Sequence, residues 1–277
     1  MQVICLHAKE DIEDLLRRNV YLHLYALGDL DDFFWPYTTW YALSDGRRLG
    51  QVALLYTGAA LPVLLGLADK PLDEMRALLR GILHLLPRRL YAHLSHNLTT
   101  VFEEDYHVDS HGPHYKMALM DRSCVQHVDT SSAVHLSTQD LPQLETLYRE
   151  SYPGNSFDAR MLETGLFYGV REGPDLVCAA GVQVYSPLFR VAALGNVTTH
   201  PHARGKGWAT VASARVCQAL MSTVDHIGLN AKADNRSALA CYERLGFRCI
   251  AEYEECFLEL KHVYDSIRPQ DDQDISM

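Results

Sequence analysis

One segment in the second half of the chain places a strand, a glycine-containing loop and a helix in direct succession. Its apolar run ends at Thr199, Pro201 follows, and Arg204, Gly205 and Gly207 precede an apolar-periodic helix. Glycine lets the backbone approach a ligand closely and adopt torsions that other residues avoid. The first turn of a helix offers unpaired N–H groups at its positive end, and these groups bind phosphates. The segment therefore predicts a pyrophosphate site at a helix N-terminus.

Two other phosphate-binding loops do not fit this segment. A Walker A loop needs glycine five residues before its Gly-Lys pair and Ser or Thr after it, but this chain has His200 and Gly207 there. The dinucleotide fingerprint would need a third glycine at Thr210. The remaining alternative is a turn that glycine makes flexible and that binds no ligand.

The charge near this loop differs from that of the whole chain. Residues 196–248 contain seven Arg or Lys and three Asp or Glu, whereas the full chain carries a net charge of −10 with histidine neutral. A local basic region suits a phosphorylated cofactor, although uneven scatter along the chain would also produce it. The acidic total disfavours nucleic acid as a partner.

A second motif follows the next predicted strand. Asn235 stands where a helix N-cap belongs, and Tyr242 lies two turns further on about the same helix face. Gly246 ends the helix, and Phe247 begins another strand. Tyr242 is either a tyrosine packed at the edge of the core or a hydroxyl that donates a proton to a leaving group.

Together, the loop at 204–209 and the segment 235–247 resemble the GNAT superfamily of acyl-CoA-dependent N-acyltransferases. The resemblance covers roughly residues 133–261 and includes the order of the elements. It implies an α/β (α+β) fold with a mixed, mostly antiparallel sheet flanked by helices. It also implies transfer of an acetyl group from acetyl-CoA to an amine, by direct attack in a ternary complex and without a metal.

The same resemblance implies roles for individual residues. Tyr242 would hydrogen-bond the thioester sulfur and protonate the departing thiolate, and Asn235 would contact the pantetheine or order the loop. A backbone N–H near Val197, on a strand that splays from its neighbour, would bind the developing oxyanion. The expected cofactor-binding residues are Val197, Thr198, Thr199, Arg204, Gly205, Lys206, Gly207, Trp208, Ala209, Thr210, Asn235 and Tyr242.

The sequence leaves the general base open. Glu163, Tyr185, Asn196 and His200 are candidates by position, but Asn196 cannot act as a base, and water relays would make a single base unnecessary. The one cysteine within the two motifs, Cys241, is expected to point away from the site, which argues against an acyl-cysteine intermediate.

The pattern of elements divides the chain into two similar units, which suggests an internal duplication. Residues 1–121 form a degenerate GNAT-like unit, 122–132 a polar linker and 133–261 the catalytic unit; 262–277 are expected to be a partly disordered tail. Each unit is expected to close with a strand pair. In the catalytic unit, this pair comprises 247–251 and 255–260.

The first unit offers no equivalent cofactor loop. The positions before its long helix lack an Arg-x-x-Gly pair, and Asp69 would repel a pyrophosphate.

The start of the first unit is expected to form a helix over 9–28. Residues 27–41 then place three acids before a cluster of aromatics. This segment is either a substrate wall for a cationic or aromatic acceptor, or a core aromatic patch beside a solvated acidic turn.

The remaining features concern metals and the compartment. The pairs His93-x-x-His96 and His111-x-x-His114 lack a third ligand at fixed spacing, so no metal site is expected. The seven cysteines are scattered without a CxxC spacing, the first residues lack a secretory signal, and no apolar run is long enough to span a membrane. A cytoplasmic protein with reduced thiols and no membrane partner is therefore expected.

The sequence leaves the acceptor, the catalytic role and the oligomeric state open. The acceptor is either a small-molecule amine or a protein amino group. The chain is either an enzyme or a non-catalytic acyl-CoA sensor or interaction module, and Tyr242 favours the enzyme because a pure binder needs no proton donor. A homodimer is compatible with the sequence.

Overall fold

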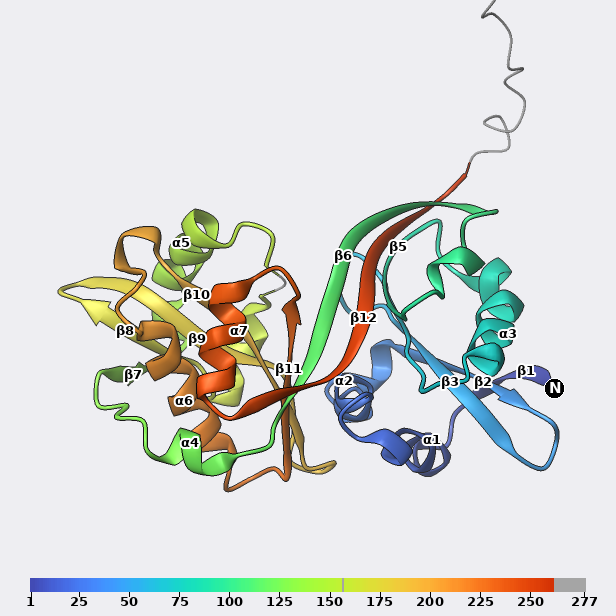
Figure 1. Cartoon of the computed structure of the whole chain (residues 1–277), viewed down its shortest axis with the longest axis horizontal. Coiled ribbons are helices and arrows are strands. Elements are labelled where there is room, and N and C mark those ends of the chain that lie inside the picture. The colour runs from blue at the N-terminus through green and yellow to red at the C-terminus, as the bar shows by residue number, and fades with distance from the viewer. Residues whose placement is uncertain (156, 262–277) are drawn as a thin grey trace, which may run out of the picture.

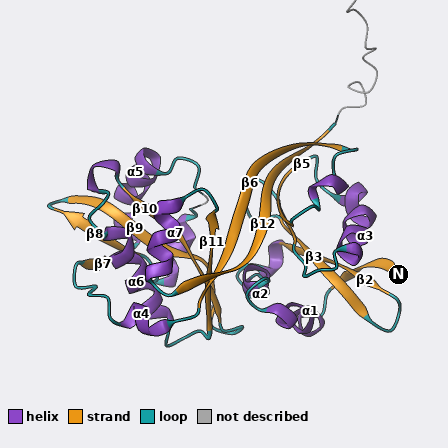
Figure 2. Cartoon of the chain, viewed as in Figure 1, coloured by secondary structure: helices purple, strands orange, loops and turns teal. Residues whose placement is uncertain are grey.

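One continuous twelve-stranded sheet runs through the chain. The computed structural model describes residues 1–155 and 157–261, so the expected tail lies outside the described residues. The strand order is β1-β2-β3-β4-β5-β12-β6-β11-β10-β9-β8-β7. Among the strands of the described residues, only the β4–β5 and β10–β11 pairs are parallel. The expected class, a mixed and mostly antiparallel sheet flanked by helices, is confirmed (Figure 2).

The first half, residues 1–121, contains six strands and three helices. In chain order they are β1 (Gln2–Leu6), α1 (Lys9–Leu16), α2 (Leu24–Gly28), β2 (Thr38–Ser44), β3 (Leu49–Tyr56), β4 (Val63–Gly66), α3 (Asp73–Ile82), β5 (Arg89–Ser95) and β6 (Tyr106–Leu119).

The second half repeats this plan with longer helices. Its elements are α4 (Arg122–Gln126), β7 (Ala133–His135), α5 (Leu141–Ser151), β8 (Tyr168–Glu172), β9 (Asp175–Ser186), β10 (Val191–Thr199), α6 (Trp208–Leu220), β11 (His226–Lys232), α7 (Arg236–Arg244) and β12 (Phe247–Leu260). No helix among the described residues is long and apolar enough to cross a membrane.

Two long strands, β6 and β12, are shared between the halves (Figure 1). The C-terminal part of β12 lies between β5 and the start of β6, whereas the end of β6 lies between β11 and the start of β12. Each half is therefore completed by a strand that begins in the other half.

The expected strand pair 247–251 and 255–260 is wrong, because β12 is one strand of 14 residues. Its polar middle, Glu252 to Glu255, resembles a turn in the sequence, but neighbouring strands pair with this stretch on both sides. The pairing of β12 with β6 is irregular at two places, between Cys249 and Ala251 and between Glu254 and Cys256.

The expected helix over 9–28 is also interrupted. Helix α1 ends at Leu16, and a short 3₁₀ turn leads to Asn19, whose Oδ1 accepts a hydrogen bond from the Leu22 N–H at 3.2 Å. An Asn side chain that satisfies a nearby N–H competes with helix continuation. As a result, α2 begins as a separate helix with its own direction.

Helix α2 packs against β9 and β10 of the second half and thereby links the two halves. Leu24 and Leu27 share a core cluster with Val184 and Val191. Gly28 lies so close to β9 that an added Cβ would stand 1.9 Å from a Val184 methyl carbon. A glycine is required here because any side chain would push the helix away from the sheet.

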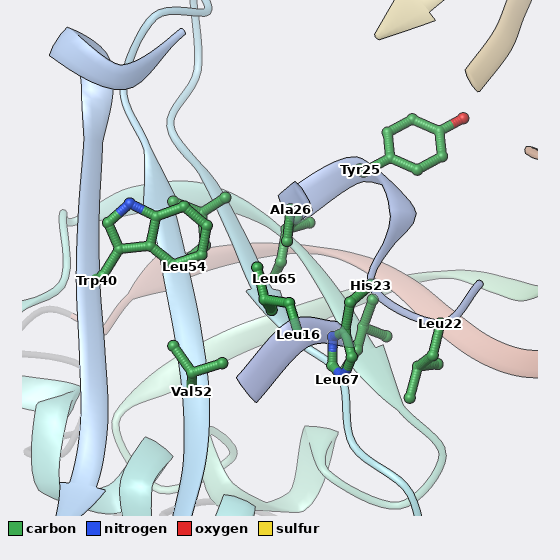
Figure 3. A pocket seen from close by; sticks show the side chains of 10 residues that line it. All are labelled: Leu16, Leu22, His23, Tyr25, Ala26, Trp40, Val52, Leu54, Leu65 and Leu67. Carbon is green, nitrogen blue, oxygen red and sulfur yellow. The ribbon is translucent and has the colours of Figure 1, made fainter. Parts of the chain in front are cut away.

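The other side of α2 covers a small cavity of about 10 Å³ within the first half (Figure 3). His23 lies among leucines there, and burial lowers the pKa of its imidazole to about 4. Tyr25 points away from the other side chains around this cavity (Figure 3). The segment is thus anchored in the first half and presents Tyr25 to the space between the halves, where it lines a large cleft.

Candidate active site

A cleft of about 1890 Å³ lies between the two halves, and both contribute to its walls. The second half supplies β10, the start of α6 and the length of α7. The first half supplies residues of α2, β3, β5 and β6. Single-ligand pockets commonly measure about 300–1,000 Å³, so this cleft has room for two substrates at once.

Strands β10 and β11 diverge at the centre of this cleft. They pair only over Val191–Leu194 and His226–Leu229. Beyond this point, Thr198 and Thr199 pair with β9, whereas β11 continues along β6. The β11-facing edge of residues 195–199 is therefore left without a strand partner, and these residues line the cleft. The expected splayed strand is present.

The backbone is unusual where the two strands separate. Asn196 has a positive φ of 54°, which is uncommon for a residue other than glycine. Its carbonyl accepts a 2.8 Å hydrogen bond from the buried Tyr148 hydroxyl, and its side chain is also buried. Such torsions persist where surrounding contacts enforce them, often at binding sites.

The loop before α6 has the geometry of an anion site. Gly205 and Gly207 have φ values of 80° and 81°, and an added Cβ at either position would meet nothing within 4 Å. Gly207 is the N-cap of α6, a helix of 13 residues, and no side chain caps its N-terminus. The first amide groups of α6 therefore face open space in the cleft.

The cationic side chains of this loop differ from one another. The Arg204 Nε donates a hydrogen bond to the Thr199 carbonyl at 3.2 Å, and Arg204 lines the cleft. The Lys206 Nζ lies 2.8 Å from Glu172, which also accepts a bond from the Trp208 indole N–H. Lys206 is not among the residues that line the cleft. The anion site thus depends mainly on backbone groups and Arg204.

Helix α7 brings the second motif to the same cleft. Asn235 is its N-cap and accepts a bond from the Ala238 N–H at 3.2 Å. Tyr242 is 8% exposed, lines the cleft, and packs edge-on against Phe247. No hydrogen bond within the described residues engages its hydroxyl, and burial raises the pKa of that hydroxyl. Tyr242 therefore stays protonated at neutral pH and has a proton to give.

Comparisons with known proteins agree with this geometry. Residues 168–257 match the family model described as FR47-like protein. A putative acetyltransferase of the GNAT family from Novosphingobium aromaticivorans is 20% identical, with a TM-score of 0.61 over 87% of this chain and 99% of that one. The chain has the GNAT fold. This confirms the resemblance inferred from the two motifs.

Other solved structures match over nearly the whole chain. A Drosophila protein is 11% identical, with a TM-score of 0.69 over 93% of this chain and 98% of that one. A tandem GNAT protein from the clavulanic acid biosynthesis pathway is 15% identical, with a TM-score of 0.55 over 92% and 98%. A search of curated proteins found no match.

Cys241 does not point away from the site of this GNAT fold, contrary to the expectation from sequence. It lines the cleft beside Tyr242, because the cleft extends around the side of α7 toward α6. Its sulfur lies 3.3 Å from the Thr210 hydroxyl, and burial raises the pKa of its thiol. A thiol held in its protonated form is a poor nucleophile, which disfavours an acyl-cysteine intermediate.

The four candidates for the general base are not gathered at this site. Asn196 lines the cleft but has no basic group. His200 lies 3.3 Å from Glu150 and outside the cleft lining, as do Glu163 and Tyr185. None of the three basic candidates is therefore supported by its position.

A polar cluster on the opposite wall was not foreseen. Glu255 of β12 accepts a hydrogen bond from the Tyr91 hydroxyl at 2.6 Å and another from Tyr253, and His93 and His114 lie 3.6 and 3.5 Å away. The strand exchange brings these residues together, so their sequence spacing gave no signal. No metal-binding group of three or more side chains occurs among the described residues.

Lys116 extends this cluster toward the splayed strands. It is 3% exposed, and its Nζ donates to the Asn230 amide oxygen at 3.3 Å. The rings of Tyr25 and Tyr253 lie 5.0 and 4.9 Å from the ammonium. Burial lowers the pKa of Lys116 to about 8.

The acidic and aromatic segment 27–41 is divided between the core and the cleft, and its role toward a substrate stays a prediction. Trp40 is buried in the core, as the structural alternative expected. Asp29 and Phe34 instead line the cleft, as the substrate-wall alternative expected. The other two acids are engaged elsewhere, because Asp31 accepts a bond from Ser186 and Asp32 pairs with Lys9, both at 2.6 Å.

Proposed function

We propose that this protein is an acyl-CoA-dependent N-acyltransferase that moves an acetyl group from acetyl-CoA to an amine. One observation carries the proposal: a single cleft contains the diverging edge of β10, the N-terminus of α6 and the Tyr242 hydroxyl, and neither of the latter two is engaged by a side chain of the described residues. The FR47-like match and the GNAT fold support acyl transfer as the class of reaction.

The cofactor would use groups that the chain leaves free. The amides of 208–210 would bind the pyrophosphate, with Arg204 beside them. The open edge of residues 195–199 would pair with the pantetheine arm, which carries amide groups of its own. The two positive-φ glycines leave room for the phosphates, because no side chain occupies that space.

The transfer would occur by direct attack. The neutral amine nitrogen attacks the thioester carbonyl carbon, a C–N bond forms, and the C–S bond then breaks. Tyr242 donates its proton to the departing sulfur, and the proton left on nitrogen returns to the phenolate through solvent. A backbone N–H on residues 195–199 would stabilise the oxyanion.

The decisive test is to incubate the purified protein with acetyl-CoA and a panel of amines. The panel should include small-molecule amines and peptides with free amino groups. We expect release of free thiol matched by an equal amount of N-acetylated product for at least one acceptor. Tight CoA binding without product from any amine would instead support the non-catalytic sensor.

A further inference from the structure

We propose that Asp29, supplied by the first half of the chain, binds the acceptor amine and takes its proton. This inference rests on the proposed acyl transfer and names the base that the sequence left open. It assigns the half without a cofactor loop a direct part in the reaction.

The position of the Asp29 side chain is the first observation. Asp29 is only 8% exposed, yet it lines the cleft that also contains Asn196 and Tyr242. No hydrogen bond or ion pair within the described residues engages its carboxylate. A buried carboxylate without a partner is costly, so such a group is a candidate for binding a cationic ligand.

The second observation is that the backbone holds Asp29 in place. It is the C-cap of α2, and its N–H donates to the Tyr25 carbonyl at 2.9 Å. The preceding Gly28 is pressed against Val184 of β9. These contacts fix the backbone that carries the carboxylate against the second half.

The third observation is the set of groups around Asp29. Phe34 of the same segment and Tyr56 of β3 line this part of the cleft. Asp158 also lines the cleft and pairs at 2.5 Å with Arg160, which is not among the lining residues. No cationic side chain of the described residues pairs with Asp29, and burial raises the pKa of its carboxyl to about 8.

The other buried acid of the cleft is a weaker candidate. Glu255 already accepts hydrogen bonds from Tyr91 and Tyr253, and two histidines flank it. The histidines and these hydrogen bonds outweigh its burial and lower the pKa of its carboxyl. A satisfied carboxylate with a lowered pKa is a poor base, whereas Asp29 is unsatisfied.

The proton balance follows from this arrangement. The Asp29 carboxylate binds the ammonium form of the acceptor and takes one proton, which leaves a neutral amine and a carboxylic acid. The amine then attacks the thioester as described above, and Tyr242 protonates the sulfur. The Asp29 proton is lost to solvent after the products leave. An apolar surrounding favours the transfer because it disfavours the ammonium–carboxylate charge pair.

The test is Asp29→Asn, which keeps the shape of the side chain and removes the charge. We expect kcat/KM for the amine to fall by about 100-fold or more, with unchanged CoA affinity and an unchanged or higher Tm. Asp32→Asn is the matched control, because Asp32 lies three residues away but outside the cleft lining. Full transfer by Asp29→Asn, or a loss of transfer that merely follows a lower Tm, would overturn the proposal.

A binding measurement separates this inference from the proposed function. Calorimetry at pH 8.5 with the CoA-loaded protein should show that phenethylamine binds more tightly than phenethyl alcohol. The preference should disappear in Asp29→Asn. If the wild type transfers no acetyl group but shows this preference, only the proposed function fails. If the wild type transfers but the preference survives in Asp29→Asn, the role of Asp29 fails.

Discussion

Tyr242 and Asp29 lie in one cleft, and burial raises the pKa of both side chains. Each becomes neutral when protonated, and loss of water disfavours the charged form of each. Burial raises the pKa of both groups, but from different starting values. The phenol therefore remains a proton donor throughout the neutral range, whereas the carboxyl becomes a base whose ionisation falls within that range.

We expect Tyr242→Phe to lower the rate constant of transfer by about 100-fold, because it removes only the proton donor. CoA affinity and Tm should be unchanged, since the ring still packs against Phe247. Steady-state kinetics with a known acceptor measures the rate constant, and calorimetry measures the CoA affinity. Full activity in this variant would show that another group protonates the thiolate.

We expect Asp29→Asn to be more stable than the wild type, by an amount that depends on pH. The pKa of Asp29 is raised from 3.8 to about 8 in the folded protein. Between these values, the unfolded chain loses a proton that the folded chain keeps, so stability contributed by protonation decreases as pH rises. The advantage of the variant should therefore grow from pH 4 to pH 8 and then level off.

Urea unfolding at pH 5, 7 and 9 measures this difference. The size of the effect is on the order of a few kcal/mol at pH 9. Asp32→Asn should show no such trend, because that side chain is 92% exposed. A constant difference between Asp29→Asn and wild type across this range would mean that Asp29 is not held protonated.

At the scale of elements, a single substitution at the N-terminus of α6 should be enough to abolish CoA binding. Gly207→Glu would place a carboxylate and its stem in the open space before the helix. We expect CoA binding to be lost by calorimetry, because the charge repels the pyrophosphate and the side chain occupies its place. The positive φ adds strain of about 1 kcal/mol, so the fold should survive.

Gly173→Glu provides the matched control for that substitution. Gly173 also has a positive φ, 64°, and open space at its Cβ position, but it lies in the β8–β9 turn and outside the cleft lining. It should bear similar strain and retain CoA affinity. Equal CoA affinity in both variants would rule out the α6 N-terminus as the cofactor site.

At the scale of the whole molecule, the exchange of β6 and β12 makes the halves depend on each other. A fragment of residues 126–277 would lack the part of β6 that lies between β11 and β12. A fragment of residues 1–125 would likewise lack the part of β12 beside β5. Exposed sheet edges of this kind favour aggregation.

We therefore expect neither fragment to fold alone and the co-expressed pair to assemble. The reconstituted pair should bind one CoA, because the Arg204 to Gly207 loop precedes α6 of the second half, whereas the positions before α3 of the first half hold no Arg-x-x-Gly pair. Size-exclusion chromatography and CoA calorimetry measure both outcomes. A monomeric, cooperatively folded 126–277 fragment would show that the shared strands are dispensable.

The sequence alone determined the features that depend on local chemistry. The Arg204 to Gly207 loop, the Asn235 cap and the strand–helix order are encoded within short segments, because torsions and capping are set by neighbouring residues. These segments were sufficient to infer the GNAT fold and the surface where α6 begins.

Only the tertiary structure decided which acids, histidines and lysine meet in the cleft. Asp29, Lys116 and Glu255 come from distant segments, and they converge because β6 and β12 pass between the halves and α2 packs on β9 and β10 of the second half. Such contacts depend on how the elements pack, which residue spacing along the chain does not record.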